Sequence, residues 1–107
     1  MTPAGSKPQA YVYIISNKSH RLYIGIAVDL LARVEEHRTG AYPNGFTARY
    51  HFDRLVYFEV AATKRTAARR EKELKGWSRP KKVALIQAMN PNWLDLTPRL
   101  HWSATLV

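Results

Sequence analysis

Two short strand-forming runs with a turn between them constrain this sequence more than any other feature. Residues 11–16, YVYIIS, are aromatic and β-branched, whereas residues 21–26, RLYIGI, alternate aliphatic side chains with a tyrosine and a glycine. The residues between them, NKSH, are typical of a turn. The pattern predicts an antiparallel hairpin whose aliphatic face packs in the core, with Tyr23 and Gly25 on the other face.

The register of this hairpin decides what lies beside Gly25. With a loop of three or five residues, Tyr13 is expected directly across from Tyr23 on the same face, whereas a four-residue loop places them on opposite faces. In either case Gly25 leaves a gap in the side-chain layer, because a glycine within a strand often marks close approach by a ligand or another backbone. From spacing alone, the better explanation is an aromatic pair packed in a core.

A helix with clear end signals follows the hairpin. Asp29 is a good N-cap for residues 30–38, and Gly40 stands where a helix often ends in a left-handed residue. Residues 39–51 contain glycine, proline and asparagine without sustained periodicity, so they predict a loop of a length that often carries binding residues.

The second half of the chain continues with a strand and two helices. Residues 54–60 are again β-branched and aromatic, and helices are expected over 63–77, with Thr63 as cap, and over 79–89, with Ser78 as cap. The order β-β-α-β-α-α predicts an α+β fold, in which three helices flank a three-stranded, largely antiparallel sheet.

Length and composition limit the domain organisation and the compartment. A chain of 107 residues with 46% hydrophobic side chains is expected to form one domain over 10–96, with arms at 1–9 and 97–107. It contains no cysteine, and no apolar run is long enough to span a bilayer. We therefore expect a cytoplasmic protein without a membrane partner.

The charge balance points to a polyanionic partner. Seventeen Lys and Arg oppose eight Asp and Glu, and nine of the basic residues lie between Lys64 and Lys82. Such clustering favours nucleic acid over an evenly solvated surface, and over an anionic membrane, for which the segment has too few large apolar residues. The expected nucleic-acid-binding side chains are Arg33, Lys64, Arg69, Lys75, Lys81 and Lys82.

Three positions on the expected helices carry groups suited to phosphate chemistry. Arg33 and His37 are four residues apart and border the apolar stripe of their helix. Arg33 is suited to hold a phosphate oxygen, although an ion pair with Glu36 is the simpler explanation of this residue. For His37 the simpler explanation is a position on a solvated edge of the helix. Glu71 lies at the margin of its apolar face, where it either pairs with Lys75 or binds a divalent metal.

These features together resemble the GIY-YIG nuclease superfamily. The resemblance rests on YVY at 11–13, YIG at 23–25, Arg33, His37 and a glutamate in the helix after the third strand. It extends from about residue 11 to residue 96 and is closest to small stand-alone bacterial members related to the nuclease domain of the excision-repair incision subunit. The first triplet departs from the family pattern, because Tyr-Val-Tyr replaces Gly-Ile-Tyr and keeps only the tyrosine.

The resemblance implies divalent-metal-dependent hydrolysis of DNA phosphodiesters. Glu71 would hold one Mg²⁺ or Mn²⁺, Tyr13 would activate or orient the attacking water, and Tyr23 would assist it. Arg33 would clamp the scissile phosphate, and His37 would relay a proton or contact phosphate. Tyr50 is a weaker candidate, and the roles of Asn90 and Asn92 stay open. No small-molecule organic cofactor is implied.

We therefore expect an endonuclease of low sequence specificity that acts in DNA repair or processing. Duplex, structured and single-stranded DNA are equally plausible substrates, because a domain of this size has little surface left for reading bases. The alternative is a nucleic-acid-binding module with little or no catalytic activity. A scaffold that docks an acidic protein is a third class, and it predicts weak affinity for DNA.

Overall fold

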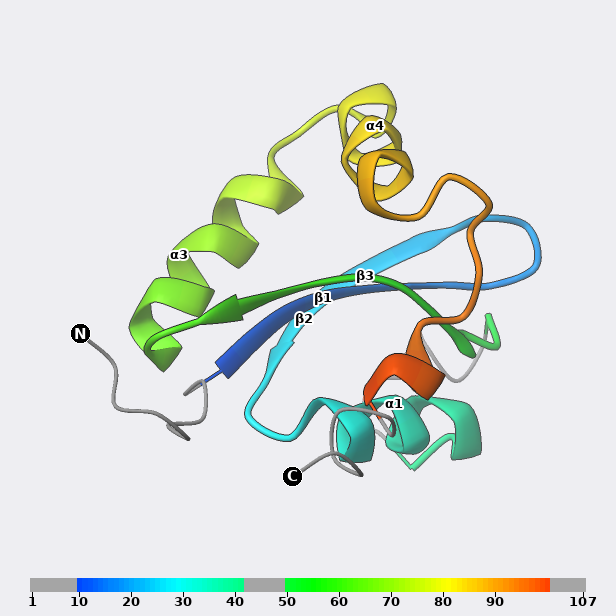
Figure 1. Cartoon of the computed structure of the whole chain (residues 1–107), viewed down its shortest axis with the longest axis horizontal. Coiled ribbons are helices and arrows are strands. Elements are labelled where there is room, and N and C mark those ends of the chain that lie inside the picture. Colours follow the sequence, from blue (N-terminus) through cyan, green and yellow to red (C-terminus); the bar gives the residue numbers. More distant parts are fainter. Residues whose placement is uncertain (1–9, 42–49, 101–107) are drawn as a thin grey trace.

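The computed structural model describes residues 10–41 and 50–100. The expected N-terminal arm and most of the loop expected over 39–51 lie outside these ranges. Three strands form an antiparallel sheet in the order β2-β1-β3 (Figure 1): β1 (Ala10–Ser16), β2 (Leu22–Ala27) and β3 (Arg54–Ala61). β2 is therefore an edge strand, with β1 in the centre.

Within the described ranges, the helices that accompany the sheet are α1 (Leu30–Thr39), α3 (Lys64–Lys75) and α4 (Arg79–Met89). Each begins at the predicted cap, because a side-chain oxygen accepts a hydrogen bond from a first-turn N–H at Asp29, Thr63 and Ser78. Gly40 ends α1 in the left-handed conformation, with φ of 76°. The predicted fold class and order of elements are confirmed.

The hairpin register differs from the expected one. β1 runs to Ser16 and β2 starts at Leu22, so the connection has five residues and Tyr13 pairs with Gly25, while Ile15 pairs with Tyr23. The prediction that Tyr13 lies directly across from Tyr23 is wrong. The two tyrosines share a face but are diagonal neighbours. A direct pairing would require the five-residue loop to span 16–20, whereas the loop in the structure spans 17–21.

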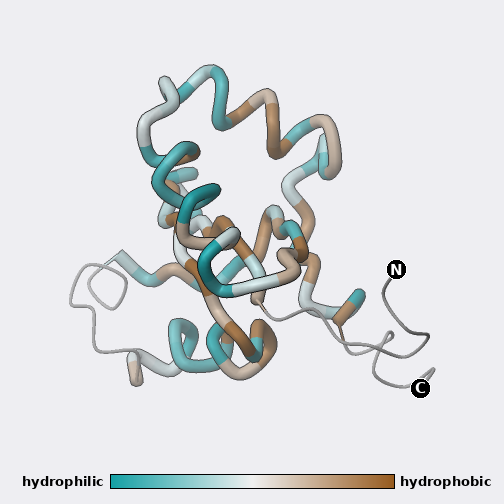
Figure 2. Tube along the Cα trace, turned by 90° about the vertical axis from the view of Figure 1, so that its left-hand side faces the viewer, coloured by the Kyte–Doolittle hydropathy of each residue, from teal (hydrophilic) through white to brown (hydrophobic). Residues whose placement is uncertain are grey.

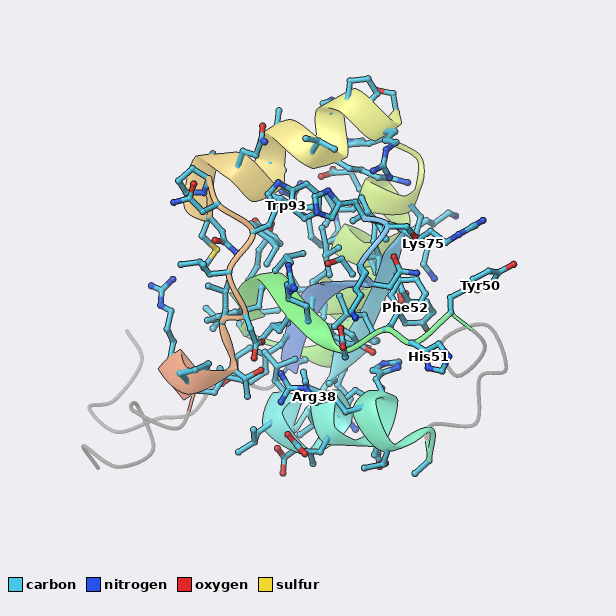
Figure 3. The ribbon with its side chains drawn as sticks, turned by 90° about the vertical axis from the view of Figure 1, so that its right-hand side faces the viewer. Arg38, Tyr50, His51, Phe52, Lys75 and Trp93 are labelled. Atoms are coloured by element: carbon cyan, nitrogen blue, oxygen red, sulfur yellow. The ribbon has the colours of Figure 1, made fainter. Side chains whose placement is uncertain are left out.

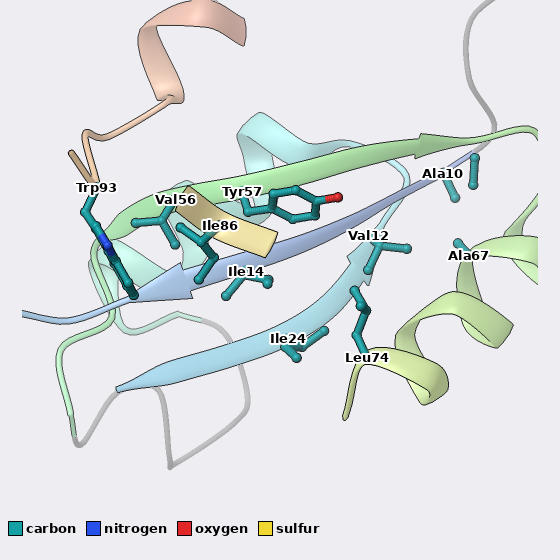
Figure 4. Packing of buried hydrophobic residues seen from close by; sticks show 11 residues of the cluster. Ala10, Val12, Ile14, Ile24, Val56, Tyr57, Ala67, Leu74, Ile86 and Trp93 are labelled. Carbon is teal, nitrogen blue, oxygen red and sulfur yellow. The ribbon is translucent and has the colours of Figure 1, made fainter. Parts of the chain in front are cut away.

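The two faces of the sheet pack against different helices. Val12, Ile14 and Ile24 meet Ala67 and Leu74 of α3 in one cluster, which also takes in Ile86 of α4 (Figure 4). The other face carries a second cluster, which Leu30 and Val34 of α1 cover. Figure 1 accordingly shows α1 on one side of the sheet, with α3 and α4 on the other. No helix within the described ranges has the length and apolar character needed to cross a membrane.

The segment after α4 is fixed to both α1 and β3. Asp95 accepts hydrogen bonds from the backbone of Leu55 and from Thr97, and Arg38 of α1 donates to Asp95 at 2.6 Å and to Thr97 at 2.9 Å. Residues 97–100 form one helical turn beyond this point. Ordered structure thus continues past residue 96, into the first residues of the expected C-terminal tail.

Candidate active site

Two tyrosines and a histidine meet on the sheet face that α1 covers. The hydroxyl of Tyr13 lies 2.8 Å from Nε2 of His37, and both side chains are buried. The ring of Tyr23 is 6.4 Å from that of Tyr13 and 5.3 Å from that of His37, measured between centroids. The hairpin and α1, which are separate in the sequence, therefore bring together three of the predicted catalytic residues.

His37 is buried as a neutral base. Burial, and then the charge of Arg33, lower its pKa from 6.5 to about 4. With only 3% of its surface exposed, His37 is not on a solvated edge, so that simpler expectation is wrong. A neutral imidazole has one ring nitrogen that accepts a hydrogen bond, and Nε2 can take this role toward the Tyr13 hydroxyl when Nδ1 carries the hydrogen.

Gly25 makes room for this contact. A Cβ atom built at Gly25 would lie 2.6 Å from the hydroxyl oxygen of Tyr13 and 2.8 Å from Cζ of the same ring. The expected gap in the side-chain layer is thus present, and the end of the Tyr13 ring occupies it. Because Tyr13 has no exposed surface while Tyr23 is half-buried, Tyr23 forms the solvent side of the cluster.

Arg33 links α1 to the edge strand. Its guanidinium donates to the carbonyl oxygen of Ile26 in β2 at 2.9 Å and to Glu36 at 3.1 Å. The pair with Glu36 that helix spacing allowed is therefore formed, between side chains that are 29% and 49% exposed. A pair so exposed contributes little to stability, so Glu36 can yield Arg33 to another anion at low cost.

Glu71 lies on α3, the helix that packs against the sheet face opposite the aromatic cluster. Its side chain is 23% exposed, as expected at the margin of the apolar face, whereas that of Glu73 is 55% exposed. Glu71 and Lys75 form the expected ion pair, with 3.3 Å between Nζ and Oε2. In Figure 3 the side chain of Lys75 extends to the same side of the molecule as Tyr50.

The neighbouring glutamates are committed to another partner. Arg70 donates to both carboxylate oxygens of Glu59 in β3, at 2.9 to 3.2 Å, and also contacts Glu73. Burial opposes the charge on Glu59, but its hydrogen bonds from Arg70 and Tyr57 outweigh that effect and hold its pKa below the usual range. Sequence reasoning did not single out Glu59, since an acidic residue within a strand gives no signal of its partner.

The donor set for a metal in this region is therefore one carboxylate, that of Glu71. Within residues 10–41 and 50–100, no three His, Cys, Asp or Glu side chains come together as a ligand group. A single carboxylate nevertheless fits Mg²⁺, which commonly keeps several waters and is bound through one or two carboxylates together with substrate phosphate. The exposed ammonium of Lys75 is a weak competitor for that carboxylate.

The predicted basic residues fall into three settings. Lys64 and Arg69 are exposed on α3, whose turns are largely hydrophilic in Figure 2. Lys81 lies 4.1 Å above the ring of Trp77, and Lys75 pairs with Glu71. Lys82 is half-buried at the start of α4. The structure thus places these five residues on α3 and α4, whereas the sixth predicted residue, Arg33, lies on α1.

The structure shows packing or backbone contacts for two of the residues whose roles the sequence left open, Asn90 and Tyr50. Asn90 is 4% exposed, and its amide bridges the carbonyl oxygens of Val56 and Leu94. Tyr50 packs against the second cluster, and Asn92 is exposed. Phe52, which sequence reasoning missed, packs its ring 6.2 Å from that of Tyr23.

Comparison with known proteins finds a matching family model, relatives and a solved structure. A family model described as the GIY-YIG catalytic domain matches residues 9–84. UPF0213 proteins from Staphylococcus aureus strains Mu3, Mu50 and COL are each 40% identical over 77 residues, which cover 72% of this chain and 93% of the relative. The solution NMR structure of a UPF0213 protein from Bacillus halodurans superposes with a TM-score of 0.52 and 32% identity, over 82% of this chain and 93% of that one.

Proposed function

This chain belongs to the GIY-YIG family, a nuclease superfamily, and we propose that it is a divalent-metal-dependent endonuclease that hydrolyses DNA phosphodiesters with little sequence preference. The observation that carries the proposal is the 2.8 Å hydrogen bond between the hydroxyl of Tyr13 and the buried, neutral His37. The clustered positive charge supports a nucleic acid substrate. A role in DNA repair or processing is part of the same proposal.

The protonation energetics favour Tyr13 as a group that orients water. Moving a proton from an ordinary phenol, with a pKa near 10, to a histidine with a pKa of about 4 spans roughly six pKa units, or about 8 kcal/mol. His37 is therefore a poor final holder of the proton. As a hydrogen-bond acceptor it instead fixes the Tyr13 hydroxyl. Because that hydroxyl has no exposed surface, the attacking water would have to enter past Tyr23 to donate a hydrogen bond to its oxygen.

The other residues act on the phosphate. Tyr23, at the solvent side of the cluster, would position the water relative to the scissile bond, and Arg33 would exchange Glu36 for a phosphate oxygen and stabilise charge in the transition state. Glu71 would hold one Mg²⁺ or Mn²⁺. When bound, such an ion supplies positive charge to the phosphate and to the leaving 3′ oxygen. Water adds its oxygen to phosphorus as the P–O bond to the 3′ oxygen breaks, which leaves a 3′ hydroxyl and a 5′ phosphate.

Nicking of supercoiled plasmid tests this function. We expect the wild-type protein to nick the plasmid with Mg²⁺ or Mn²⁺, and Glu71→Ala to lower the rate about 100-fold or more. Glu73→Ala is the matched control, because it removes a glutamate of the same helix that Arg70 neutralises. Equal rates for the two variants and the wild type would remove the basis for Glu71 as the metal ligand.

A DNA-binding module without catalysis is the second candidate function. The observation that favours it is that Glu71 stands on a helix that packs against the sheet face opposite the aromatic cluster, and that it is already paired with Lys75. This alternative predicts salt-dependent DNA binding by the wild type, together with no nicking above background in either metal.

A further inference from the structure

A basic cleft lies at the hairpin end of β2, outside the aromatic cluster. It has a volume of about 230 Å³ and is lined by Leu22 and by three cationic side chains, those of Arg21, Arg79 and Lys82. The clefts that hold drug-sized ligands are larger, roughly 300 to 1,000 Å³. This cleft is thus sized for a small polar group rather than for an organic cofactor.

The charges around the cleft are unbalanced. None of its lining residues is acidic, and in the described parts of the chain none of the three cations forms an ion pair with a carboxylate. By contrast, Arg33, Arg38 and Arg70 are all paired. Three like charges around one cleft repel each other, and an anion placed between them relieves that repulsion.

The cleft is held in a fixed form from both sides. Arg79 of α4 donates to the carbonyl oxygen of His20 at 2.8 Å, and the ring of His20 stacks on that of Trp93 with centroids 4.3 Å apart and planes 2° apart. Figure 3 shows Trp93 close beneath α4. On the hairpin side, the backbone N–H of Arg21 donates to the side chain of Asn17, which is only 7% exposed. Such preorganisation lowers the entropy cost of binding.

The cleft lies close enough to the aromatic cluster for one nucleic acid strand to contact both. Arg21 precedes Tyr23 by two residues, so about 7 Å of extended chain separates the cleft from the solvent side of the aromatic cluster. The guanidinium of Arg21 also lies 4.4 Å above the ring of Tyr50, which places a half-buried aromatic ring next to the cleft. A strand bound at the cluster can therefore extend along the hairpin with a neighbouring phosphate at the cleft.

We propose that this cleft binds a backbone phosphate of a nucleic acid strand, flanking the phosphodiester that is cleaved. The inference rests on the proposed function and extends it, because it assigns Arg21 and Arg79 to strand binding. Inorganic phosphate has the same oxygen chemistry, so the experiment must separate a strand from the free ion.

Salt-dependent binding of a fluorescent oligonucleotide tests the cleft. A contact to one phosphate adds roughly 0.7 to 0.9 to the slope of log K against log salt, so Arg79→Gln is expected to reduce the slope by about that amount and the affinity several-fold. The control is Lys18→Gln, an exposed lysine of the same hairpin loop that does not line the cleft. Equal losses in both variants would indicate a diffuse basic surface and would overturn the proposal.

A second measurement does not depend on a variant. In ¹⁵N-labelled wild-type protein, the oligonucleotide should shift the backbone amide signals of Arg21, Leu22 and Lys82, whereas inorganic phosphate at the same phosphate concentration should leave them in place. Equal shifts with both would identify a site for free phosphate and overturn the strand assignment. If the wild type nicks plasmid while these signals stay unmoved, the cleft inference alone fails; if the wild type neither binds nor nicks DNA, the proposed function fails.

Discussion

Acidification should destabilise this protein through one buried side chain, His37. Its pKa is about 4 in the folded state and 6.5 as the ordinary value, so between these pH values the unfolded chain binds a proton that the folded protein does not. Stability from this group is fully present above pH 6.5 and is lost as the pH falls toward 4. Integration gives a loss of about 2 kcal/mol in the free energy of unfolding between pH 7.5 and pH 5.

The assay is urea denaturation at pH 7.5 and at pH 5, followed by tryptophan fluorescence. The change in unfolding free energy between the two pH values should be about 2 kcal/mol smaller in His37→Gln than in the wild type. His51→Gln, which removes an exposed histidine, is the matched control and should follow the wild type. If His37→Gln loses as much stability on acidification as the wild type, His37 is not a buried neutral base, and the argument for the Tyr13 contact fails with it.

Three further substitutions test other parts of the structure. Gly25→Ala places a methyl group 2.6 Å from the Tyr13 hydroxyl, so it should lower the free energy of unfolding by about 1 to 3 kcal/mol, read from the urea midpoint, and should also reduce nicking. An unchanged midpoint would show that the ring yields without cost. Asn90→Ala removes hydrogen bonds to Val56 and Leu94 and should cost about 2 to 4 kcal/mol by the same assay, but nicking per folded molecule should persist; a catalytic asparagine would reverse that result. Burial opposes the charge on Asp95, but hydrogen bonds from Thr97, the charge of Arg38 and the Leu55 N–H outweigh this effect and hold the pKa of Asp95 below the usual 3.8. The stability that the charged carboxylate contributes is therefore lost as the pH falls below about 4. Asp95→Asn should therefore be less stable at pH 7 and show a flatter acid limb in thermal melts; a limb as steep as that of the wild type would contradict this account.

The fold could be predicted because its signals are local. Caps at Asp29, Thr63 and Ser78, and the period-two pattern of the hairpin, act within a few residues, so the sequence places each element to within one or two residues. The hairpin register could not be placed in this way. The register depends on the residue at which the loop begins. A shift of that start by one residue decides whether Tyr13 pairs with Tyr23 or with Gly25.

The candidate site could be predicted only in part, since much of it depends on contacts between distant segments. The pair of Glu71 with Lys75 and the difference in exposure between Glu71 and Glu73 follow from helical spacing. The burial of His37 does not, because it is the packing of α1 against the sheet that encloses the ring. The basic cleft was missed for the same reason: its cations lie 58 residues apart, at Arg21 and Arg79, and nothing in either local sequence indicates the other.

The hydrogen bond between Tyr13 and His37 serves packing and the proposed chemistry together, which determines how variants of this site must be interpreted. Both side chains are almost fully buried, and the Tyr13 ring leaves no room for a side chain larger than that of glycine at position 25. A loss of nicking in a variant of the pair therefore has two physical sources, unfolding and misplacement of the hydroxyl. The two separate by magnitude, because a stability loss of 2 kcal/mol leaves a protein of ordinary stability almost fully folded, whereas a misplaced hydroxyl lowers the rate in every folded molecule.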